Sequence, residues 1–261
     1  MQPNWDYVKK TTLWNYEDLI KKIRFVTSFP TLWKAYNTNL TQAIVFARNM
    51  FPENNIEAGE YPARVISTIE KLKSGLVIDW GHLLENISSR SDCKKFIAEH
   101  NLHFEEFIDV LNYLLRWAFP FQTSSRELLD HGSLQEMTWY EDLKKHKLST
   151  SFELLERGHT SAGRIDLANL TKLPLDFVTR LVHRADIARL PFVRRKTILP
   201  ACGAGYDTLA KIAAADVVNM DSDMQAYFRH KEGKPWENYK SVIVLKMMIS
   251  GAQTLPIIME E

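Results

Sequence analysis

The sequence has little cysteine, no long apolar run and no apolar leader. Two cysteines, Cys93 and Cys202, occur in 261 residues, which excludes a disulfide framework and favours a reducing compartment. The most apolar stretch, residues 247–259, is interrupted by polar residues and is shorter than the about 20 residues that a membrane-spanning helix needs. The first ten residues contain no apolar segment of the kind found in signal peptides. We therefore expect a cytoplasmic protein without membrane contact.

Net charge and phosphate-binding motifs are also scarce. Lys and Arg number 33 and Asp and Glu 32, which excludes a uniformly basic nucleic-acid coat. Gly203 and Gly205 form only a Gly-x-Gly, and no predicted strand precedes them, so neither common glycine-rich phosphate motif is present. His100 and His103 lie three residues apart without a third metal ligand nearby. We expect no cofactor, no metal and no catalytic residue.

The sequence does contain helical periodicity in nearly every segment. Apolar residues recur at helical spacing in residues 16–27 and 176–189, among others. Asn15 is a typical N-cap, and Pro30 is a typical first-turn residue of a helix that we expect to continue to Met50. Asn-Gly and Asp-Gly hairpin signals are missing. The pattern predicts an all-α fold.

A shift of 71 residues places residues 66–132 on residues 137–203 without a gap. Eleven of the 67 positions are then identical. They include Leu83-Leu84-Glu85 with Leu154-Leu155-Glu156, and Pro120-Phe121 with Pro191-Phe192. Five further pairs are apolar in both segments, namely Phe104 with Leu175, Phe107 with Val178, Val110 with Leu181, Leu111 with Val182, and Phe119 with Leu190. The match predicts an internal duplication of one helical unit.

The two copies differ in charge. Residues 81–150 contain eight basic and 11 acidic side chains, whereas residues 151–211 contain ten basic and six acidic ones. The second copy has a basic set made of Arg180, Arg184, Arg189, Arg194, Arg195 and Lys196. The first copy has Asp109, Tyr113, Ala118, Thr123, Ser124 and Ser125 at these positions. Because one copy forms without them, the basic residues are candidates for a binding face.

The segment Glu153–Arg164 resembles the bacterial family called domain of unknown function 4332, which is similar to helix-hairpin-helix modules. The resemblance continues through Leu173-Pro174 and Ala185-Asp186. It is clearest over about 137–215 and weaker over about 66–132. It implies an all-α, hairpin-based fold and no reaction. Together with the repeat and the helical periodicity, we expect an all-α fold of tandem helix-hairpin-helix-like modules with N- and C-terminal helical extensions.

The resemblance divides the chain into four expected parts. They are a helical N-terminal region (1–60), a first module (61–132), a second module (133–215) and a C-terminal helical extension (216–261).

The turn at which helix-hairpin-helix modules typically bind phosphate is altered here. Such a turn contains glycine, and its backbone N–H groups face the phosphate. The corresponding residues 190–194 contain Pro191 and no glycine, and residues 119–123 likewise contain Pro120 and no glycine. Proline also removes one N–H group.

We therefore predict a non-enzymatic interaction protein. It is a helical adaptor or scaffold that binds a protein partner, or a second copy of itself, through the polarised pair of repeats. Binding of the DNA or RNA phosphate backbone by the basic face of the second module is the alternative. A third interpretation leaves that face without a direct role. An enzyme would require His159, Arg164, His183 and Asp186 to meet in one pocket.

Overall fold

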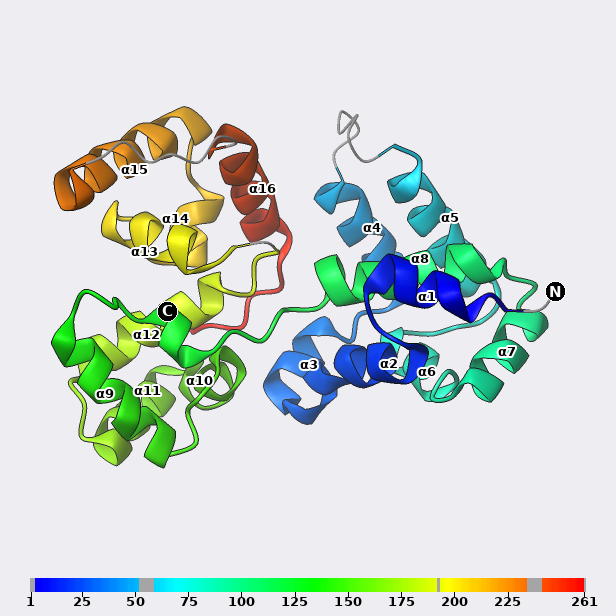
Figure 1. The fold of residues 1–261 in the computed structure, drawn as a ribbon, viewed down its shortest axis with the longest axis horizontal. Helices are drawn as coiled ribbons and strands as arrows, with labels where there is room; N and C mark the ends of the chain where they lie inside the picture. The colour runs from blue at the N-terminus through cyan, green and yellow to red at the C-terminus, as the bar shows by residue number, and fades with distance from the viewer. Residues whose placement is uncertain (1–2, 52–58, 192, 234–240, 261) are drawn as a thin grey trace. The chain divides into compact units, whose positions relative to one another are not determined.

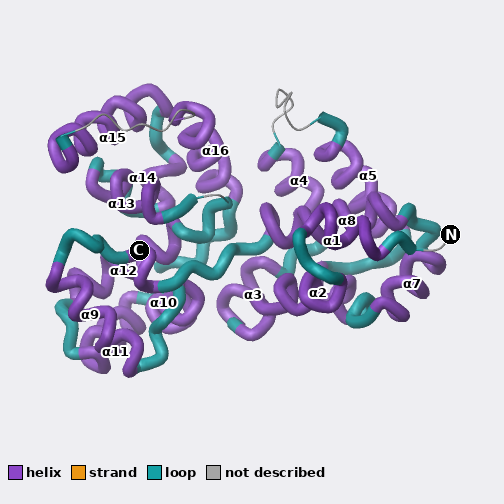
Figure 2. Tube along the Cα trace, in the orientation of Figure 1, coloured by secondary structure: helices purple, strands orange, loops and turns teal. Residues whose placement is uncertain are grey.

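The computed structural model describes residues 3–51, 59–191, 193–233 and 241–260 (Figure 1). Helices and loops make up this part of the chain, and its β-structure is limited to two isolated bridges, Asn39 with Asp79 and Ser124 with Thr150 (Figure 2). The predicted all-α fold is confirmed. The chain forms two compact units, Met1–Pro120 and Phe121–Glu261.

The first unit contains eight described α-helices. They are α1 (Trp5–Thr12), α2 (Tyr16–Arg24), α3 (Pro30–Tyr36), α4 (Leu40–Met50), α5 (Tyr61–Ser74), α6 (Trp80–Glu85), α7 (Arg90–Glu99) and α8 (Phe104–Tyr113). A 3-10 turn, η1 (Phe25–Ser28), follows α2, and a π-helical turn, η3 (Leu114–Ala118), extends α8. Helix α8 contacts both α5 and α1, and its residues 107–113 are all buried.

The second unit begins with the 3-10 turn η4 (Ser125–Leu128). Its described α-helices are α9 (Leu134–Lys145), α10 (Ser151–Gly158), α11 (Ser161–Thr171), α12 (Leu175–Ile187), α13 (Arg195–Gly203), α14 (Leu209–Ala213), α15 (Val217–Glu232) and α16 (Ser241–Thr254). The expected parts 133–215 and 216–261 fall in this unit, and 1–60 falls in the first. The part 61–132 continues past the boundary at residue 120. The four-part division stays a prediction.

Side-chain caps begin several helices, and Asn15 is the N-cap that the sequence predicts. The Asn15 side chain accepts a hydrogen bond from the Asp18 N–H at 2.8 Å. The Thr160 hydroxyl accepts one from the Gly163 N–H at 2.9 Å. Each cap satisfies a backbone donor that the first helical turn leaves without a partner.

The predicted continuous helix from Pro30 to Met50 is wrong. Helix α3 ends at Tyr36, and α4 begins at Leu40. Two asparagines in the break use their side chains as acceptors for backbone N–H groups, one local and one far along the chain. Asn39 accepts from the Gln42 N–H at 3.0 Å, and Asn37 accepts from the Gly81 N–H at 2.7 Å. Such bonds compete with helical hydrogen bonding, so the chain turns here.

The shift of 71 residues also matches two unusual backbone conformations. Leu76 and Lys147 are both left-handed, with φ of 65° and 57°. Asn101 and Lys172 are also both left-handed, with φ of 46° and 59°. A left-handed conformation is uncommon for residues other than glycine.

Helix starts match at the same shift. Asp79 and Thr150 are the N-caps of α6 and α10, and both belong to the isolated bridges. Ser89 and Thr160 are the N-caps of α7 and α11. These coincidences support the predicted duplication, which remains a prediction.

Helix α12 is the central helix of the second unit. Its apolar side, which includes Val178, Leu181, Val182 and Ala185, is buried against α10, α11 and neighbouring helices. Gly158 allows the close approach of α10, because a Cβ atom there would lie 2.7 Å from a methyl group of Val182. Close packing of this kind excludes a larger side chain without a shift of the helices.

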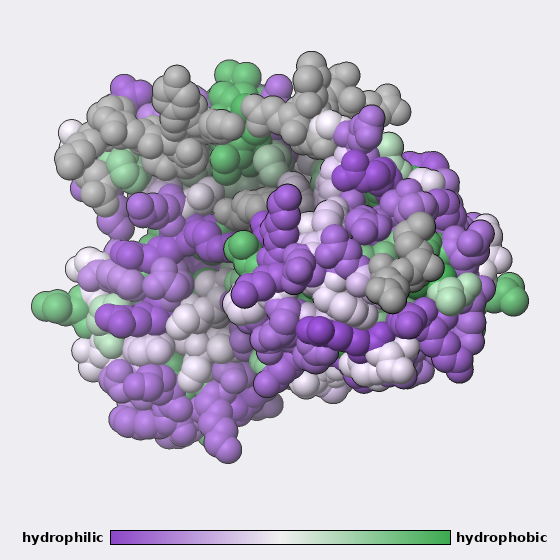
Figure 3. Space-filling view, turned by 45° about the vertical axis from the view of Figure 1, so that its right-hand side comes forward, coloured by the Kyte–Doolittle hydropathy of each residue, from purple (hydrophilic) through white to green (hydrophobic). Residues whose placement is uncertain are grey.

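Hydrophilic side chains cover most of the face shown in Figure 3, and apolar residues form separate areas between them. None of the described helices combines the length and the hydrophobicity needed to cross a bilayer.

Replacement of Thr150 by alanine tests the shared helix-start pattern. Thr150 and Glu153 form a reciprocal capping box at the start of α10. We expect Thr150→Ala to lower the free energy of unfolding by about 1 kcal/mol, measured by urea denaturation. Thr150→Ser keeps the hydroxyl and is the control. Equal stability of the wild type, Thr150→Ala and Thr150→Ser would contradict the assignment of Thr150 as a stabilising N-cap of α10.

Candidate functional site

The six predicted basic residues do not share one exposed face. Arg189 lies in the interior, with only 2% of its surface exposed. Its guanidinium group forms an ion pair with Asp186 at 2.6 Å and donates a hydrogen bond to the Pro256 carbonyl at 3.0 Å. Arg189 therefore holds the segment after α16 to α12 and is not available to an external phosphate.

Arg184 is also bound within the unit. It forms an ion pair with Glu136 at 3.0 Å and donates to the Leu128 carbonyl. Both charged side chains are close to nine-tenths buried. The positions 71 residues earlier hold Val65 and Tyr113, which are buried in the first unit.

The other four residues are more accessible. Arg180 is exposed and pairs with Asp176 at 2.6 Å. Arg194 stacks on the Phe121 ring at 5.0 Å and donates to the Val193 carbonyl, and burial lowers its pKa. Arg195 is half-buried and Lys196 is exposed. The structure thus divides the predicted face into Arg180 on α12 and a short basic segment, residues 194–196, at the start of α13.

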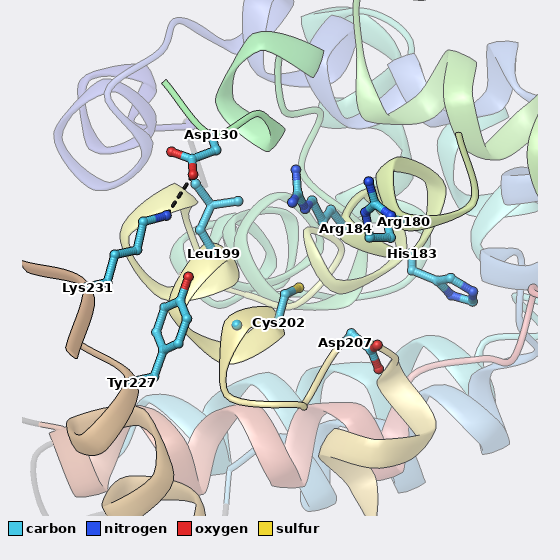
Figure 4. Close-up of a pocket in the computed structure, with 10 residues that line it drawn as sticks. Asp130, Arg180, His183, Arg184, Leu199, Cys202, Asp207, Tyr227 and Lys231 are labelled. Carbon is cyan, nitrogen blue, oxygen red and sulfur yellow. Dashed lines mark hydrogen bonds and ion pairs between the residues drawn. The ribbon is translucent and has the colours of Figure 1, made fainter. Parts of the chain in front are cut away.

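A cavity of about 230 Å³ lies where α12, α13 and α15 meet (Figure 4). Three cationic side chains line it, namely Arg180, Arg184 and Lys231. Two carboxylates, Asp130 and Asp207, also line it. Each of these cations has a carboxylate partner, because Arg180 pairs with Asp176, Arg184 with Glu136 and Lys231 with Asp130, so an incoming anion would have to replace one of these carboxylates.

Lys231 and Asp130 join α15 to the loop before α9 at one edge of the cavity. Their charged atoms are 2.6 Å apart (Figure 4). The hydrogen bond lowers the pKa of Asp130 and raises that of Lys231, so both stay charged at neutral pH. Gly203 allows the Tyr227 ring to complete the wall, because a Cβ atom at Gly203 would overlap that ring.

Cys202 places its sulfur in the cavity wall (Figure 4). Burial raises the pKa of the thiol to about 11, although the nearby Arg184 acts in the opposite direction. The thiolate is the reactive form of cysteine. Cys202 is therefore a neutral thiol at physiological pH and a poor nucleophile.

His183 is the only one of the four residues required by the enzyme hypothesis that lines this cavity. Burial lowers its pKa, and its Nδ1 atom is buried without a hydrogen-bond partner among the described residues. Arg164 is used elsewhere, because it donates to the main-chain carbonyls of Gly158, His159 and Glu260. Within the described ranges, no group of three or more His, Cys, Asp and Glu side chains is arranged to hold a metal ion.

The two units differ in what covers the equivalent sides of α8 and α12. In the first unit, α1 lies against α8 (Figure 1). Phe104 is only 3% exposed and Asp109 only 2%. The positions 71 residues later are Leu175, which is 46% exposed, and Arg180, whose side chain is 51% exposed. We call the surface formed by Leu175 and Arg180 the open face of α12.

Sequence reasoning identified Arg180 and missed the rest of this surface. The pairing of Phe104 with Leu175 is visible at the 71-residue shift. Phe104 is covered by α1, a helix far from it in the chain, whereas Leu175 is exposed. The cavity was missed because Tyr227 and Lys231 come from α15, which shows no link to α12 in the sequence.

Residues 136–237 match the model of a family described as domain of unknown function (DUF4332). This confirms the expected resemblance, whose clearest part was placed at about 137–215. No curated protein and no solved structure matches the chain.

Disruption of the buried Asp186–Arg189 pair tests its structural role. Asp186→Asn removes the carboxylate that pairs with the buried Arg189 guanidinium, and we expect a loss of about 3–5 kcal/mol in the free energy of unfolding. Asp176→Asn removes the carboxylate of the exposed pair with Arg180 and is the matched control, with little expected change. Similar losses in both variants, measured by urea denaturation, would contradict the structural assignment of Arg189.

The raised cysteine pKa values predict slow alkylation. Burial raises the pKa of both Cys93 and Cys202 to about 11, so their thiolate fraction at pH 8 is about 100-fold below that of an ordinary cysteine. We expect iodoacetamide to label both residues slowly in the folded protein, faster as the pH rises, and at the ordinary rate in urea. Rapid labelling of folded Cys202 at pH 8 would show that it is an activated thiol.

Proposed function

Since the matching family has no assigned function, we propose from the geometry that this protein is a non-enzymatic interaction protein. It acts as a helical adaptor or scaffold that binds a protein partner at the open face of α12. The observation that carries the proposal is the contrast between Phe104 and Asp109, which are covered, and Leu175 and Arg180, which are exposed.

The open face of α12 combines an apolar side chain with a positive charge. Protein interfaces typically have an apolar centre and a polar rim, and arginine is enriched among the residues that contribute most to binding. The apolar surface of Leu175 is next to the charged pair Asp176–Arg180 on the same helix. A protein partner gains from covering both, as α1 does at the equivalent positions of α8.

The uneven charge of the two repeats supports a partner with acidic groups. The segment 151–211 has ten basic against six acidic side chains. Complementary charge accelerates encounter and selects among partners. A second copy of the chain also offers acidic groups, because residues 81–150 contain 11 acidic against eight basic side chains.

Nucleic-acid binding is the alternative, and it rests on residues 194–196. Sequence-independent binding to phosphates depends on several free cations on one surface. Arg184 and Arg189 have buried or nearly buried counterions, which removes two of the six predicted contacts. Lys196 is exposed at the start of α13, next to Arg194 and Arg195, so this segment keeps the alternative open to a direct test.

Affinity capture with matched variants tests the proposal. The wild-type protein, Leu175→Asp and Leu134→Asp are used as baits in an extract of the source cells. Leu134 is 89% exposed on α9 and serves as the control for an added surface charge. We expect at least one protein to bind to wild type and Leu134→Asp, and to bind about tenfold less to Leu175→Asp. Light scattering of the wild-type protein and both variants over a range of concentrations measures whether self-association also depends on Leu175.

A salt titration with a mixed nucleic-acid pool tests the alternative. If the proposal is right, the double variant Arg194→Ala with Arg195→Ala does not lose any salt-dependent binding to nucleic acid. The adaptor function would be overturned if the protein is strictly monomeric and Leu175→Asp does not weaken the binding of any captured protein. Loss of nucleic-acid binding in the double variant would replace it with the alternative.

A further inference from the structure

We propose that the partner segment at the open face of α12 is an amphipathic helix that places an apolar, preferably aromatic, side chain on Leu175 and a carboxylate on Arg180. This inference rests on the proposed function and specifies the chemistry of the partner. The template for it is the way in which α1 covers α8 in the first unit.

Helix α1 contacts α8 through one aromatic and one polar side chain. The Trp5 ring packs edge-on against Phe104, with ring centroids 5.1 Å apart. The Tyr7 hydroxyl donates a hydrogen bond to Asp109 at 3.1 Å. Val8 is fully buried on the same helix. An apolar stripe therefore supplies the contact area, and one polar group fixes the position of the helix.

The position that holds Asp109 in the first unit and Arg180 in the second carries opposite charge in the two units. Asp109 accepts hydrogen bonds from Tyr7 and Arg64, whereas Arg180 at the equivalent position can only donate. Its counterion, Asp176, is on its own helix, and both side chains are more than half exposed. Exposed ion pairs of this type contribute little stability, so exchange of the Arg180 counterion for a partner carboxylate costs little.

Arg180 favours a carboxylate over a cation. Arg184 and Lys231 line the same cavity, and Arg180 and Arg184 extend from the same helix in the same general direction in Figure 4. Arg184 and Lys231 are paired with Glu136 and Asp130, so Arg180, whose counterion is exposed, is the cation that a partner aspartate or glutamate would reach with a charge-assisted hydrogen bond. One exposed arginine on α12 is too few cations for a nucleic-acid backbone, which favours an acidic helix.

Peptides based on α1 provide a direct probe. Three end-blocked peptides contain residues 3–14 with Tyr7 unchanged, with Tyr7→Glu, or with Tyr7→Lys. Each is titrated into the full-length protein, binding is measured by isothermal titration calorimetry, and methyl NMR at Leu175 of the wild-type protein locates the site. We expect the Tyr7→Glu peptide to bind roughly fivefold more tightly than the unchanged peptide, and the Tyr7→Lys peptide to bind most weakly.

Two protein variants make the result specific to α12. Arg180→Glu should invert the order of the three peptides, and Leu175→Asp should weaken all of them at least tenfold. Leu134→Asp should leave all three unchanged. A peptide that instead displaced α1 from α8 would give affinities independent of Arg180, and this outcome would overturn the inference.

The outcomes separate this inference from the proposed function. Partner capture that depends on Leu175, together with peptide affinities that ignore the charge at position 7, would overturn the acidic-helix inference and leave the adaptor function standing. Failure of both the capture and the peptide binding would overturn both. Salt-dependent nucleic-acid binding lost in Arg180→Glu would replace the acidic helix with a phosphate ligand.

Discussion

Burial of the apolar side of α12 is the constraint on which the second unit depends. Leu181 and Val182 are fully buried, and Gly158 lets α10 approach them closely. The end of this helix must accommodate Asp186 and, just after it, Arg189, whose charges are tolerable in the interior because they neutralise each other and because Arg189 also bonds to the Pro256 carbonyl. Once this side is buried, Leu175 and Arg180 are directed toward solvent, and the candidate site lies along that edge.

The two units apply one local pattern to different surroundings. Left-handed residues and N-caps recur 71 residues apart, which fixes where the helices begin and turn. In the first unit, α1 then covers α8 through Trp5 and Tyr7. In the second unit, the segment after α16 is held elsewhere, by Arg189 and by Arg164, which donates to the Glu260 carbonyl. The basic residues of the second copy therefore divide into those bound within the unit, such as Arg164, Arg184 and Arg189, and those that face solvent, such as Arg180 and Lys196.

Much of the fold could be predicted from the sequence because helix periodicity and caps are local. Asn15, Thr150 and Thr160 begin helices as their side chains suggest. The break at Asn37 was missed because its cause is a bond to Gly81, far along the chain. The burial of Arg189 was also missed, since arginine is typical of surfaces and its partner Pro256 is distant. The cavity was unpredictable for the same reason, because α12 and α15 meet only in the folded unit.

The central claim is that equivalent positions are covered in the first unit and open in the second. Hydroxyl-radical footprinting with mass spectrometry measures this directly, because oxidation of a side chain follows its exposure to solvent. The account predicts strong oxidation of Leu175 and protection of Phe104, although phenylalanine is intrinsically at least as reactive as leucine. Equal protection of both residues, or oxidation of Phe104 with protection of Leu175, would contradict the account.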